Sequence, residues 1–395
     1  MIRPMIQVFK PSLGEEELHG LAEIFKTGWI GLGPKTAEFE RQFAAFVGAK
    51  YAIAFNSATA ALHLACLALG IGPGDEVLVP TMTFVSTAHA IAYSGARPIF
   101  VDIDPETLTI DLEDVERKIT PRTKAVIPVH YGGHACPMNE IWDLADRHHL
   151  SVIEDAAHAC GSLYRDQRIG GLPRTDLTCF SFHAVKNLPV GDGGMITTNR
   201  VELVRPLNQL RWCGIDKSTW DRTEEVMMEQ ESGTRRYSKY GWYYEVRDLG
   251  YKYHMNDIAA VIGLVQLKKL DASNARRRQI VANYNQAFNC VSWISCPLER
   301  DYTRSACHNY VIKTPHRDGL NLYLKEKSIA TGVHYMPNHL QPYYRKQSKV
   351  TLPMAERIWT QLLTLPLYPA LTDEDVKYVI DAILSFPVAE GGDTQ

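Results

Sequence analysis

The sequence predicts an α/β protein with a large domain built on a mostly parallel central sheet and a smaller C-terminal α+β domain. From about residue 50 to residue 200, short β-branched runs alternate with segments of helical periodicity, which is typical of βαβ units. A chain of 395 residues with 45% hydrophobic content can form two cores. We expect a large domain over residues 1–265, N-terminal arm included, and a small domain over residues 266–395, joined by a long helix.

The elements are expected in the following order. Two amphipathic helices, at residues 15–26 and 36–46, precede the sheet, with an ordered loop at residues 28–34 between them. Seven strands are expected at residues 51–55, 76–79, 97–101, 125–129, 151–154, 177–181 and 194–198. Helices between them are expected at residues 59–69, 86–93 and 140–147, where apolar side chains recur at helical spacing. Functional residues should gather at the carboxyl ends of the parallel strands.

The segment from Glu202 to Arg247 differs in composition, because it is polar, rich in Trp, Tyr and charged residues, and weakly periodic. We expect a helix followed by a long excursion that is either functional or mobile. The long helix should then span residues 256–288. Runs such as His308–Lys313 and Gly332–Tyr335 should belong to the small α+β domain, and the tail at residues 390–395 should be frayed.

Composition excludes several classes of function. A formal net charge of −3 gives no basic surface for nucleic acid or for a membrane. No apolar stretch approaches the roughly 20 residues of a membrane span, and the first residues lack the apolar core of a signal peptide, so a cytoplasmic protein is expected. The eight cysteines include no CxxC pair and no zinc-like spacing, so we expect reduced thiols and no metal.

Lys186 and Asp155 carry the strongest functional signal. Lys186 follows a β-like run and precedes the cluster Gly191–Gly194, which indicates a tight loop. Asp155 ends an apolar run that predicts a buried parallel strand. Pyridoxal phosphate needs an anion that keeps its ring nitrogen protonated and an amine that forms a Schiff base. Each residue alone is ordinary, as a solvated lysine or a capping aspartate, but the pair with its glycines favours this cofactor.

A candidate phosphate site follows the first predicted strand. The stretch from Asn56 to Leu62 opens a helix with small and hydroxyl-bearing residues, and the first turn of a helix exposes unpaired N–H groups. The residues Ser57, Ala58 and Thr59 would therefore bind the phosphate, although an ordinary Ser/Thr cap explains the pattern equally well. Ser181 would add a hydroxyl to the same phosphate.

The cofactor chemistry sets the charge of each group. Asp155 has to stay ionised beside the protonated ring. Lys186 has to be a free base when it is released from the aldehyde, and burial together with nearby positive charge would lower its pKa. Phe84, which follows another strand end, would stack on the ring or simply belong to the core. His158, one helical turn beyond Asp155, would steady the ring or the carboxylate, or make a structural hydrogen bond.

Together these motifs resemble the DegT-type sugar aminotransferases, a branch of the fold-type I pyridoxal-phosphate enzymes. The resemblance covers nearly the whole chain, through segments 28–31, 56–62, 154–162, 181–194, 250–260 and 332–337. It implies that Lys186 forms the Schiff base, that Asp155 binds the ring nitrogen and that Phe84 stacks on the ring. It also implies that Ala58, Thr59 and Ser181 surround the phosphate, that glutamate is the amino donor, and that pyridoxamine phosphate is the intermediate form of the cofactor.

The resemblance further implies a homodimer with shared active sites. In such enzymes, the segment that matches Gly250–Met255 crosses to the phosphate of the partner subunit. The family's frequent Asn and Arg in this motif are replaced here by Lys252 and His254. Because Lys252 still offers a cation, we expect this contact with an altered geometry.

Finer resemblances concern the reaction and the sugar. A related dehydratase branch carries histidine where this chain has Lys186, which disfavours that branch. His158 and the stretch Val129–Gly132 look more like the enzymes that aminate carbon 4 of the sugar than those that aminate carbon 3. Gly250–Tyr253 and Asn274–Arg277 resemble enzymes of UDP-linked 4-keto sugars, while GDP-perosamine synthases share much of the pattern.

We therefore expect glutamate-dependent transamination of a nucleotide-linked 4-keto, 6-deoxy sugar, in the biosynthesis of amino sugars or of a surface polysaccharide such as the lipopolysaccharide O-antigen. The residues expected to bind the sugar are Trp29, Ile30, His183, His334 and Tyr335. Basic groups of the excursion or of the partner subunit would bind the diphosphate.

Other functions stay open as alternatives. They are a GDP-perosamine-synthase-type enzyme, a carbon-3 sugar aminotransferase, and a sensor that binds pyridoxal phosphate without turnover. The absence of a basic region argues against a DNA-binding sensor. Another pyridoxal-phosphate chemistry, that of an aldolase, desulfurase or decarboxylase acting on amino acids, is a further alternative, although no cysteine has the distinctive setting that a desulfurase needs. A nicotinamide-dependent oxidoreductase is disfavoured because no GxGxxG follows an early strand.

Overall fold

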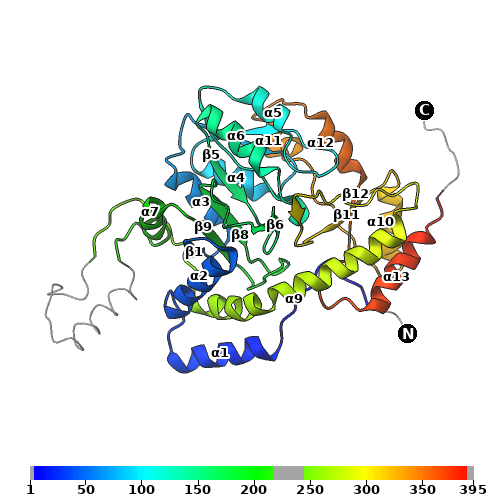
Figure 1. Cartoon of the computed structure of the whole chain (residues 1–395), viewed down its shortest axis with the longest axis horizontal. Coiled ribbons are helices and arrows are strands. Elements are labelled where there is room, and N and C mark those ends of the chain that lie inside the picture. The colour runs from blue at the N-terminus through cyan, green and yellow to red at the C-terminus, as the bar shows by residue number, and fades with distance from the viewer. Residues whose placement is uncertain (1–3, 218–243, 389–395) are drawn as a thin grey trace.

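A seven-stranded sheet lies at the centre of the computed structural model, which describes residues 4–217 and 244–388 (Figure 1). The strand order is β1-β9-β8-β5-β4-β2-β3. Within this sheet, β9 runs antiparallel to β1 and β8, whereas the other neighbouring pairs are parallel. The strands are β1 (Tyr51–Phe55), β2 (Glu76–Pro80), β3 (Arg97–Val101), β4 (Thr123–Val126), β5 (Ser151–Asp155), β8 (Leu177–Ser181) and β9 (Gly194–Thr198). The predicted mostly parallel α/β sheet is confirmed.

The fourth strand is shorter than predicted and shifted toward the N-terminus. The sequence predicts residues 125–129, whereas β4 spans Thr123–Val126. The ladder ends early because Pro128 has no N–H to donate. Pro128 instead accepts the N–H of Asp155 at 2.9 Å, and Val129 makes an isolated bridge to Asp155. These contacts hold the main chain at the end of β5.

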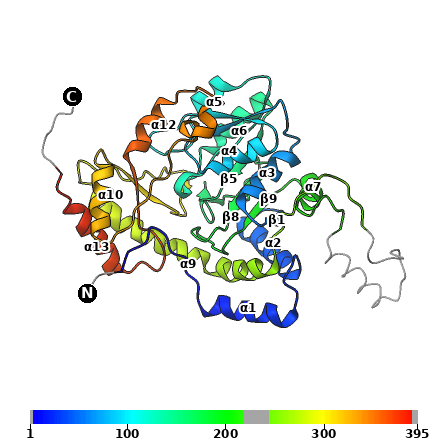
Figure 2. The ribbon, with the colours of Figure 1, turned by 180° about the vertical axis from the view of Figure 1, so that it is seen from behind.

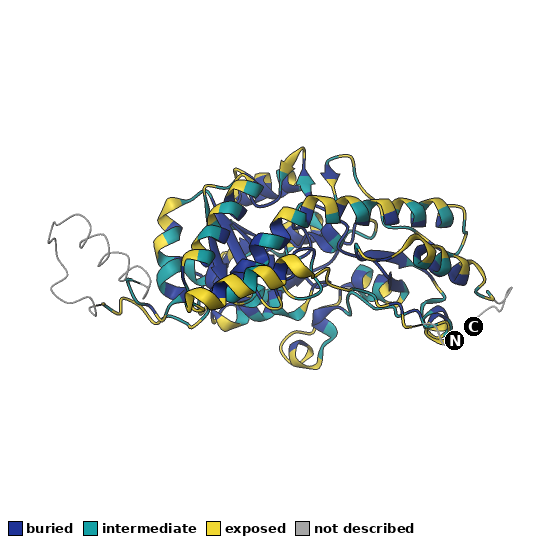
Figure 3. Ribbon diagram, turned by 90° about the horizontal axis from the view of Figure 1, so that it is seen from below, coloured by how far each residue is buried: buried dark blue, intermediate teal, exposed yellow. Residues whose placement is uncertain are grey.

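Helices cover both faces of the sheet, because alternate side chains of each strand enter two different cores. Ile53 and Leu177 belong to the core beneath α3, α4 and α7, whereas Ala54 and Phe180 belong to the core beneath α2, α6 and α9. Figure 3 shows buried strands and helices with exposed outer faces. The helices of this part are α1 (Glu15–Thr27), α2 (Pro34–Val47), α3 (Ala58–Ala68), α4 (Val85–Tyr93), α5 (Leu112–Lys118), α6 (Met138–His148) and α7 (Val201–Arg211). Of these, only the short helix α5 was absent from the prediction.

The long predicted helix is α9 (Asp257–Phe288), which runs above α1 in Figure 1 and connects the two parts of the molecule. The Asn256 side chain caps it by accepting the N–H of Ala259 at 2.9 Å. Its first turns pack beneath the sheet through residues such as Leu270, and its last turns enter a third, C-terminal core through Ile280 and Phe288. The division of the chain at residue 265 stays a prediction.

The C-terminal part is α+β, as expected. β11 (Tyr310–Lys313) pairs antiparallel with β12 (Leu362–Leu365), and α10 (Arg317–Glu326) and α13 (Asp373–Leu384) pack on them. The remaining short elements are β6 (Leu163–Tyr164), β7 (Gln167–Arg168), β10 (Thr303–Arg304), α11 (Pro342–Arg345), α12 (Pro353–Ile358), and the 3₁₀ turns η1 (Tyr131–Gly133), η2 (Asn338–Leu340) and η3 (Trp359–Gln361). The run at residues 332–335 forms no strand, because only Gly332 bridges to Thr364 before the chain turns toward the large sheet.

The N-terminal arm lies on the C-terminal core, although the sequence groups it with the large domain. Ile6 bridges Ile329 and donates its N–H to Ser328 at 2.9 Å, and Val8 accepts the N–H of Leu367 at 3.0 Å. The arm therefore runs beside α10 and α13 (Figure 2). It lies there because its open backbone groups and the Ile6 side chain find partners in that core.

The segment 202–247 is described only in part. α7 confirms the helix that we expect at its start. Residues 218–243 of the excursion and the tail at residues 390–395 lie outside the described residues. Among the helices that the structure describes, none combines the length and the apolar character that a membrane crossing requires.

Candidate active site

A cavity of about 290 Å³ opens at the carboxyl ends of the parallel strands and brings most of the predicted residues together. Its walls come from the start of α3, the segment after β2, the ends of β5 and β8, the Lys186 loop and residues 334–335. The predicted residues that line it are Ser57, Ala58, Thr59, Phe84, Asp155, His158, Ser181, His183, Lys186, His334 and Tyr335. Three predicted residues, Trp29, Ile30 and Lys252, lie elsewhere in the protomer.

Asp155 is buried at the end of β5, and two donors hold its carboxylate. The Thr87 hydroxyl donates to Oδ2 at 2.7 Å, and the Ala157 N–H donates to Oδ1 at 3.1 Å. Burial raises the pKa of Asp155, while these hydrogen bonds and the positive charge of Lys186 oppose the rise. A cation placed next to this carboxylate therefore keeps it ionised, and the protonated ring nitrogen of pyridoxal phosphate is such a cation.

Lys186 lies in a tight loop between β8 and β9. Its N–H donates to the His183 carbonyl at 2.8 Å, and Gly191, with φ of 98°, closes the loop by bridging His183. A side chain at Gly194 would meet the Ser57 carbonyl oxygen at 2.4 Å, so the start of β9 approaches the start of α3 only because that residue is glycine. The predicted glycine cluster thus places Lys186 beside the candidate phosphate site.

Burial lowers the pKa of Lys186 to about 8. The nearby charge of Asp155 acts in the opposite direction and raises this pKa. The sequence-based expectation that positive charge would help to lower it is therefore wrong, and desolvation is the cause. At this pKa about a tenth of the amine is a free base at pH 7, compared with less than about a thousandth at the ordinary lysine value of 10.5.

This shift predicts the pH dependence of cofactor capture. Only the neutral amine attacks an aldehyde, so an amine of lowered pKa becomes reactive as the pH rises through about 8. We expect the rate of pyridoxal phosphate incorporation into cofactor-free protein to rise around pH 8 and then level off. Stopped-flow absorbance at a series of pH values measures it. A rate that keeps rising toward the ordinary lysine value of 10.5 would contradict the burial of the amine.

His158 lies in a turn after β5, and not one helical turn beyond Asp155 as the sequence suggests. Its Nδ1 accepts the N–H of Gly132 at 3.2 Å, so Nε2 carries the hydrogen and donates it to the Tyr335 hydroxyl at 3.0 Å. Burial and the charge of Lys186 hold the pKa of His158 well below its usual range. His158 is therefore a neutral ring that orients Tyr335, and its recorded hydrogen bonds do not include Asp155.

The start of α3 satisfies both interpretations of its sequence. The Ser57 side chain caps the helix by accepting the N–H of Ala60 at 3.1 Å. The N–H groups of Ala58 and Thr59, in the first turn, have no partner within the helix and lie at the wall of the cavity. Ser181 lines the same wall. An anion would meet these N–H groups, the hydroxyls and the positive end of an 11-residue helix.

These groups fit pyridoxal phosphate. The cavity offers N–H groups for a phosphate, a buried carboxylate for a ring cation, and a buried amine whose pKa is near neutrality. Phe84 also lines it, and this aromatic residue is 57% exposed in the protomer. Among the described residues, no cluster of His, Cys, Asp or Glu has the arrangement of a metal site.

The remaining predicted residues make other contacts. The Trp29 indole donates to the Leu32 carbonyl at 3.0 Å, and Ile30 is half exposed in the loop before α2. The Lys252 ammonium lies 3.4 Å from the centre of the Trp212 ring. The sugar-binding role of Trp29 and Ile30 and the role of Lys252 at the partner's phosphate stay predictions, since a single protomer does not bring these residues to the Lys186 cavity.

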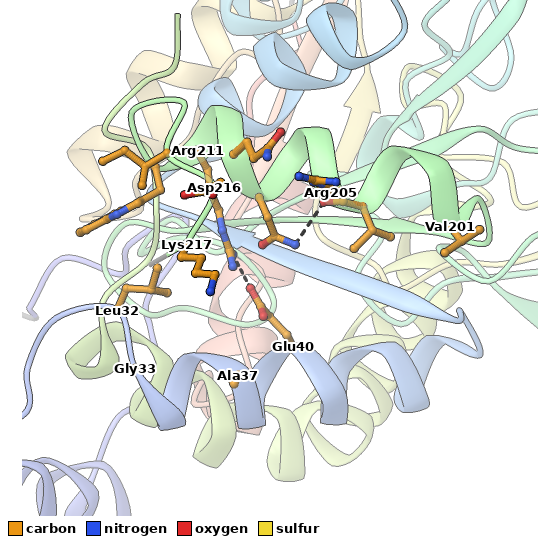
Figure 4. A pocket seen from close by; sticks show the side chains of 14 residues that line it. Leu32, Gly33, Ala37, Glu40, Val201, Arg205, Arg211, Asp216 and Lys217 are labelled. Atoms are coloured by element: carbon orange, nitrogen blue, oxygen red, sulfur yellow. Dashed lines mark hydrogen bonds and ion pairs between the residues drawn. The ribbon is translucent and has the colours of Figure 1, made fainter. Parts of the chain in front are cut away.

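A larger cavity, of about 660 Å³, lies between α2 and α7 (Figure 4). Glu40 and Arg211 form an ion pair in it, and Arg211 also donates to the Ala54 carbonyl at 2.8 Å. None of the predicted site residues lines this cavity. Its buried guanidinium already has partners that tie α7 to α2 and β1, so the contacts are structural.

Sequence reasoning missed Thr87, which holds the Asp155 carboxylate. The sequence signal that could have revealed Thr87 is weak, because a threonine in the first turn of an apolar helix is usually a cap residue. Only the packing of α4 against the end of β5 brings its hydroxyl to Asp155.

Replacing Thr87 by Val keeps the shape of the side chain but removes this donor. A hydrogen bond to a charged group contributes roughly 1.5–3 kcal/mol, so we expect Thr87→Val to weaken binding of pyridoxal phosphate about tenfold or more. Titration of cofactor-free protein, followed by absorbance, measures the dissociation constant. Thr123→Val, at the first residue of β4 and outside the Lys186 cavity, is the matched control and should bind the cofactor normally. Equal affinities in the wild type, Thr87→Val and Thr123→Val would contradict the role of Thr87.

Comparison with known proteins identifies the family. A model of the DegT/DnrJ/EryC1/StrS aminotransferase family matches residues 11–384. The chain belongs to this family. It is 44% identical over 384 residues, 94% of this chain and 95% of the relative, to the spore coat polysaccharide biosynthesis protein SpsC of Bacillus subtilis (strain 168).

Solved structures agree with this assignment. The aminotransferase TlmJ of Streptoalloteichus hindustanus superposes with a TM-score of 0.86 at 36% identity, covering 96% of this chain and 98% of TlmJ. Spr1654 of Streptococcus pneumoniae, described as a sugar aminotransferase, superposes in its PLP form with a TM-score of 0.86 at 30% identity, covering 96% of this chain and 97% of that one. Its PMP form superposes with a TM-score of 0.87 at 30% identity. The protein therefore has the fold-type I architecture and is a pyridoxal-phosphate-dependent sugar aminotransferase.

Proposed function

We propose that this protein transfers the amino group of glutamate to carbon 4 of a nucleotide-linked 4-keto, 6-deoxy sugar, in the biosynthesis of amino sugars or of a surface polysaccharide. The observation that carries the proposal is the placement of Lys186 and Asp155 in one buried cavity, with His158, His334 and Tyr335 on its remaining walls. The name of SpsC, a protein of spore coat polysaccharide biosynthesis, supports the polysaccharide context. The cytoplasm is the compartment that we predict.

Each residue has a role that follows from its surroundings. The carboxylate of Asp155, held by Thr87, keeps the ring nitrogen protonated. The N–H groups of Ala58 and Thr59 would bind the phosphate, and Phe84 would contact the ring. When bound, pyridoxal phosphate supplies an electron sink for the carbon next to the amine.

Lys186 is the group that moves the proton. With a pKa of about 8, its amine can accept a proton from the substrate carbon and return it near neutral pH. Burial of the amine excludes water, which would otherwise compete for the proton. His158 and Tyr335 orient the substrate from the opposite wall, because the His158 N–H fixes the Tyr335 hydroxyl.

We also propose a homodimer in which Lys252 reaches the partner's phosphate site. Lys252 lies close to the start of α3, because Asn56 donates its side-chain N–H to the Lys252 carbonyl at 3.4 Å and His254 bridges Phe55. This position of Lys252 supports an interface at which the Lys252 segment of each protomer approaches the phosphate site of the other protomer. Trp29 and Ile30 would contribute to substrate binding from the partner in the same way.

The direct test supplies purified holoenzyme with glutamate and a panel of UDP-, dTDP- and GDP-linked 4-keto and 3-keto sugars. We expect release of 2-oxoglutarate and a product mass that corresponds to a 4-amino sugar. If the enzyme turns over only the 3-keto sugars, the amino group is transferred to carbon 3 and not to carbon 4. If glutamate alone yields no 2-oxoglutarate, the protein is not a glutamate-dependent enzyme and a sensor is favoured.

A further inference from the structure

A second hollow adjoins the Lys186 cavity at Phe84 and Tyr335. This outer pocket, of about 560 Å³, lies between the start of α4 and residues 335–344. It shares Thr83, Phe84 and Tyr335 with the Lys186 cavity, so Phe84 and Tyr335 form the wall between the two spaces. The rings of these two residues are 6.2 Å apart. This spacing is that of an aromatic contact, and Phe84 is 57% exposed, so a ligand that starts beside Lys186 would reach the outer pocket over the open side of Phe84.

The walls of the outer pocket are aromatic and uncharged. Besides Phe84 and Tyr335 they include the rings of His89, Tyr343 and Tyr344, and no Lys, Arg, Asp or Glu stands among the described residues that line it. Burial lowers the pKa of His89, so that ring is neutral at pH 7. Such a surface suits a planar, uncharged ring and does not suit a diphosphate.

Neighbouring contacts hold the aromatic surface in place. Tyr344 is buried, and its hydroxyl bonds to Nδ1 of His89 at 2.6 Å. The Tyr343 ring stands edge-on to both, with ring centres 5.0 Å from Tyr344 and 5.7 Å from His89. Tyr343 itself is 55% exposed, so one face is open to a ligand. The side-chain amide of Gln341, on the same wall, offers a donor and an acceptor for the edge of a ring.

The Lys186 cavity is too small for the cofactor together with a whole sugar nucleotide. Its volume of about 290 Å³ is at the lower end of the range for small-molecule sites, roughly 300–1,000 Å³. The outer pocket is larger, adjacent, and chemically matched to the part of the substrate that is farthest from the reacting carbon.

We propose that the outer pocket binds the nucleobase of the sugar nucleotide, with the base stacked on Tyr343 and its edge within reach of Gln341. The inference rests on the proposed function, because it needs a nucleotide-linked substrate. Aromatic stacking tolerates any base, so the pocket supplies affinity, and the pairing of Gln341 with the base edge contributes to the choice among nucleotides.

The test measures binding of free UDP, dTDP and GDP to the holoenzyme by titration calorimetry, and the KM of the nucleotide-linked sugar. We expect Tyr343→Ala to weaken the affinity for the preferred nucleotide about tenfold and to raise the KM of the sugar by a similar factor, since base stacking on an aromatic ring contributes that much or more. Tyr343→Phe keeps the ring and should bind normally. Tyr93→Ala removes an equally exposed tyrosine, 56%, outside the pocket and is the matched control.

The outcomes separate the two proposals. Turnover of a nucleotide-linked sugar with unchanged KM and nucleotide affinity in Tyr343→Ala would overturn the base site and leave the proposed function intact. If the wild-type holoenzyme aminates only sugars without a nucleotide and binds none of the three nucleotides, both proposals fail. A change in oligomeric state of Tyr343→Ala on a sizing column, without loss of nucleotide binding, would assign this face to an interface between copies.

Discussion

Lys186→Ala should reduce the rate of transamination by roughly 10⁴-fold or more, because it removes both the group that binds the aldehyde and the group that moves the proton. The variant should also lose the visible absorbance band of the lysine-bound cofactor. Its fold should persist, since the lysine side chain is a buried cation whose removal relieves a desolvation cost. Half-reaction kinetics with glutamate and absorbance spectra of the reconstituted variant measure these effects.

Two further variants distinguish the amine from its charge and from general damage. Lys186→Arg keeps a positive charge near Asp155 but cannot act as a free base, so it should be as inactive as Lys186→Ala. Lys118→Ala removes a lysine that donates to Asp114 and to the Phe100 carbonyl, away from the cavity, and should keep its activity. An absorbance band that survives in Lys186→Ala would assign the amine to another residue.

Asp155→Asn should lower kcat by roughly 100- to 1000-fold, the range observed when one preorganised electrostatic group is removed from an active site. The amide keeps the size of the side chain but loses the negative charge that holds the ring nitrogen protonated. The cofactor should still reach Lys186, so the variant should bind pyridoxal phosphate and fail mainly in the step that needs the electron sink.

The loss of charge at Asp155 also has a spectroscopic signature. The pH at which the bound cofactor titrates should shift in Asp155→Asn, whereas a purely structural defect would alter the amount of bound cofactor and leave its titration unchanged. Asp111→Asn, at the exposed cap of α5, is the control and should cost at most about 1 kcal/mol of stability without a change in kcat. Wild-type kcat in Asp155→Asn would exclude a role for this carboxylate in the chemistry.

Much of the fold is readable from the sequence because local physics decides it. The strands β1, β3 and β8 begin and end at the predicted residues, since short β-branched and aromatic runs between polar turns have few alternatives. The errors have two sources. The chain after β4 departs from the ladder at Pro128 for a local reason, the missing N–H of proline. The placement of the N-terminal arm is a tertiary contact, because the arm pairs with Ile329, more than 300 residues away in the sequence.

The candidate site likewise contains residues that the sequence reveals and contacts that only the tertiary structure reveals. Lys186, Asp155 and the start of α3 are visible in the sequence because each follows a strand, and a parallel sheet brings strand ends together. The hydroxyl of Thr87, the tautomer of His158 and the outer pocket are not visible, because each depends on which side chains meet across separate elements.

By itself the sequence determined the class of fold and the cofactor, and it supplied the two residues that we propose for the ends of the cofactor, since these depend on residue type, order and spacing along single strands and loops. The tertiary structure alone decided that burial is what lowers the pKa of Lys186, and it alone decided the partners of Asp155 and the aromatic space beyond Phe84. The physical reason is that desolvation and contact geometry arise only when distant segments pack together, so no single stretch of sequence encodes them.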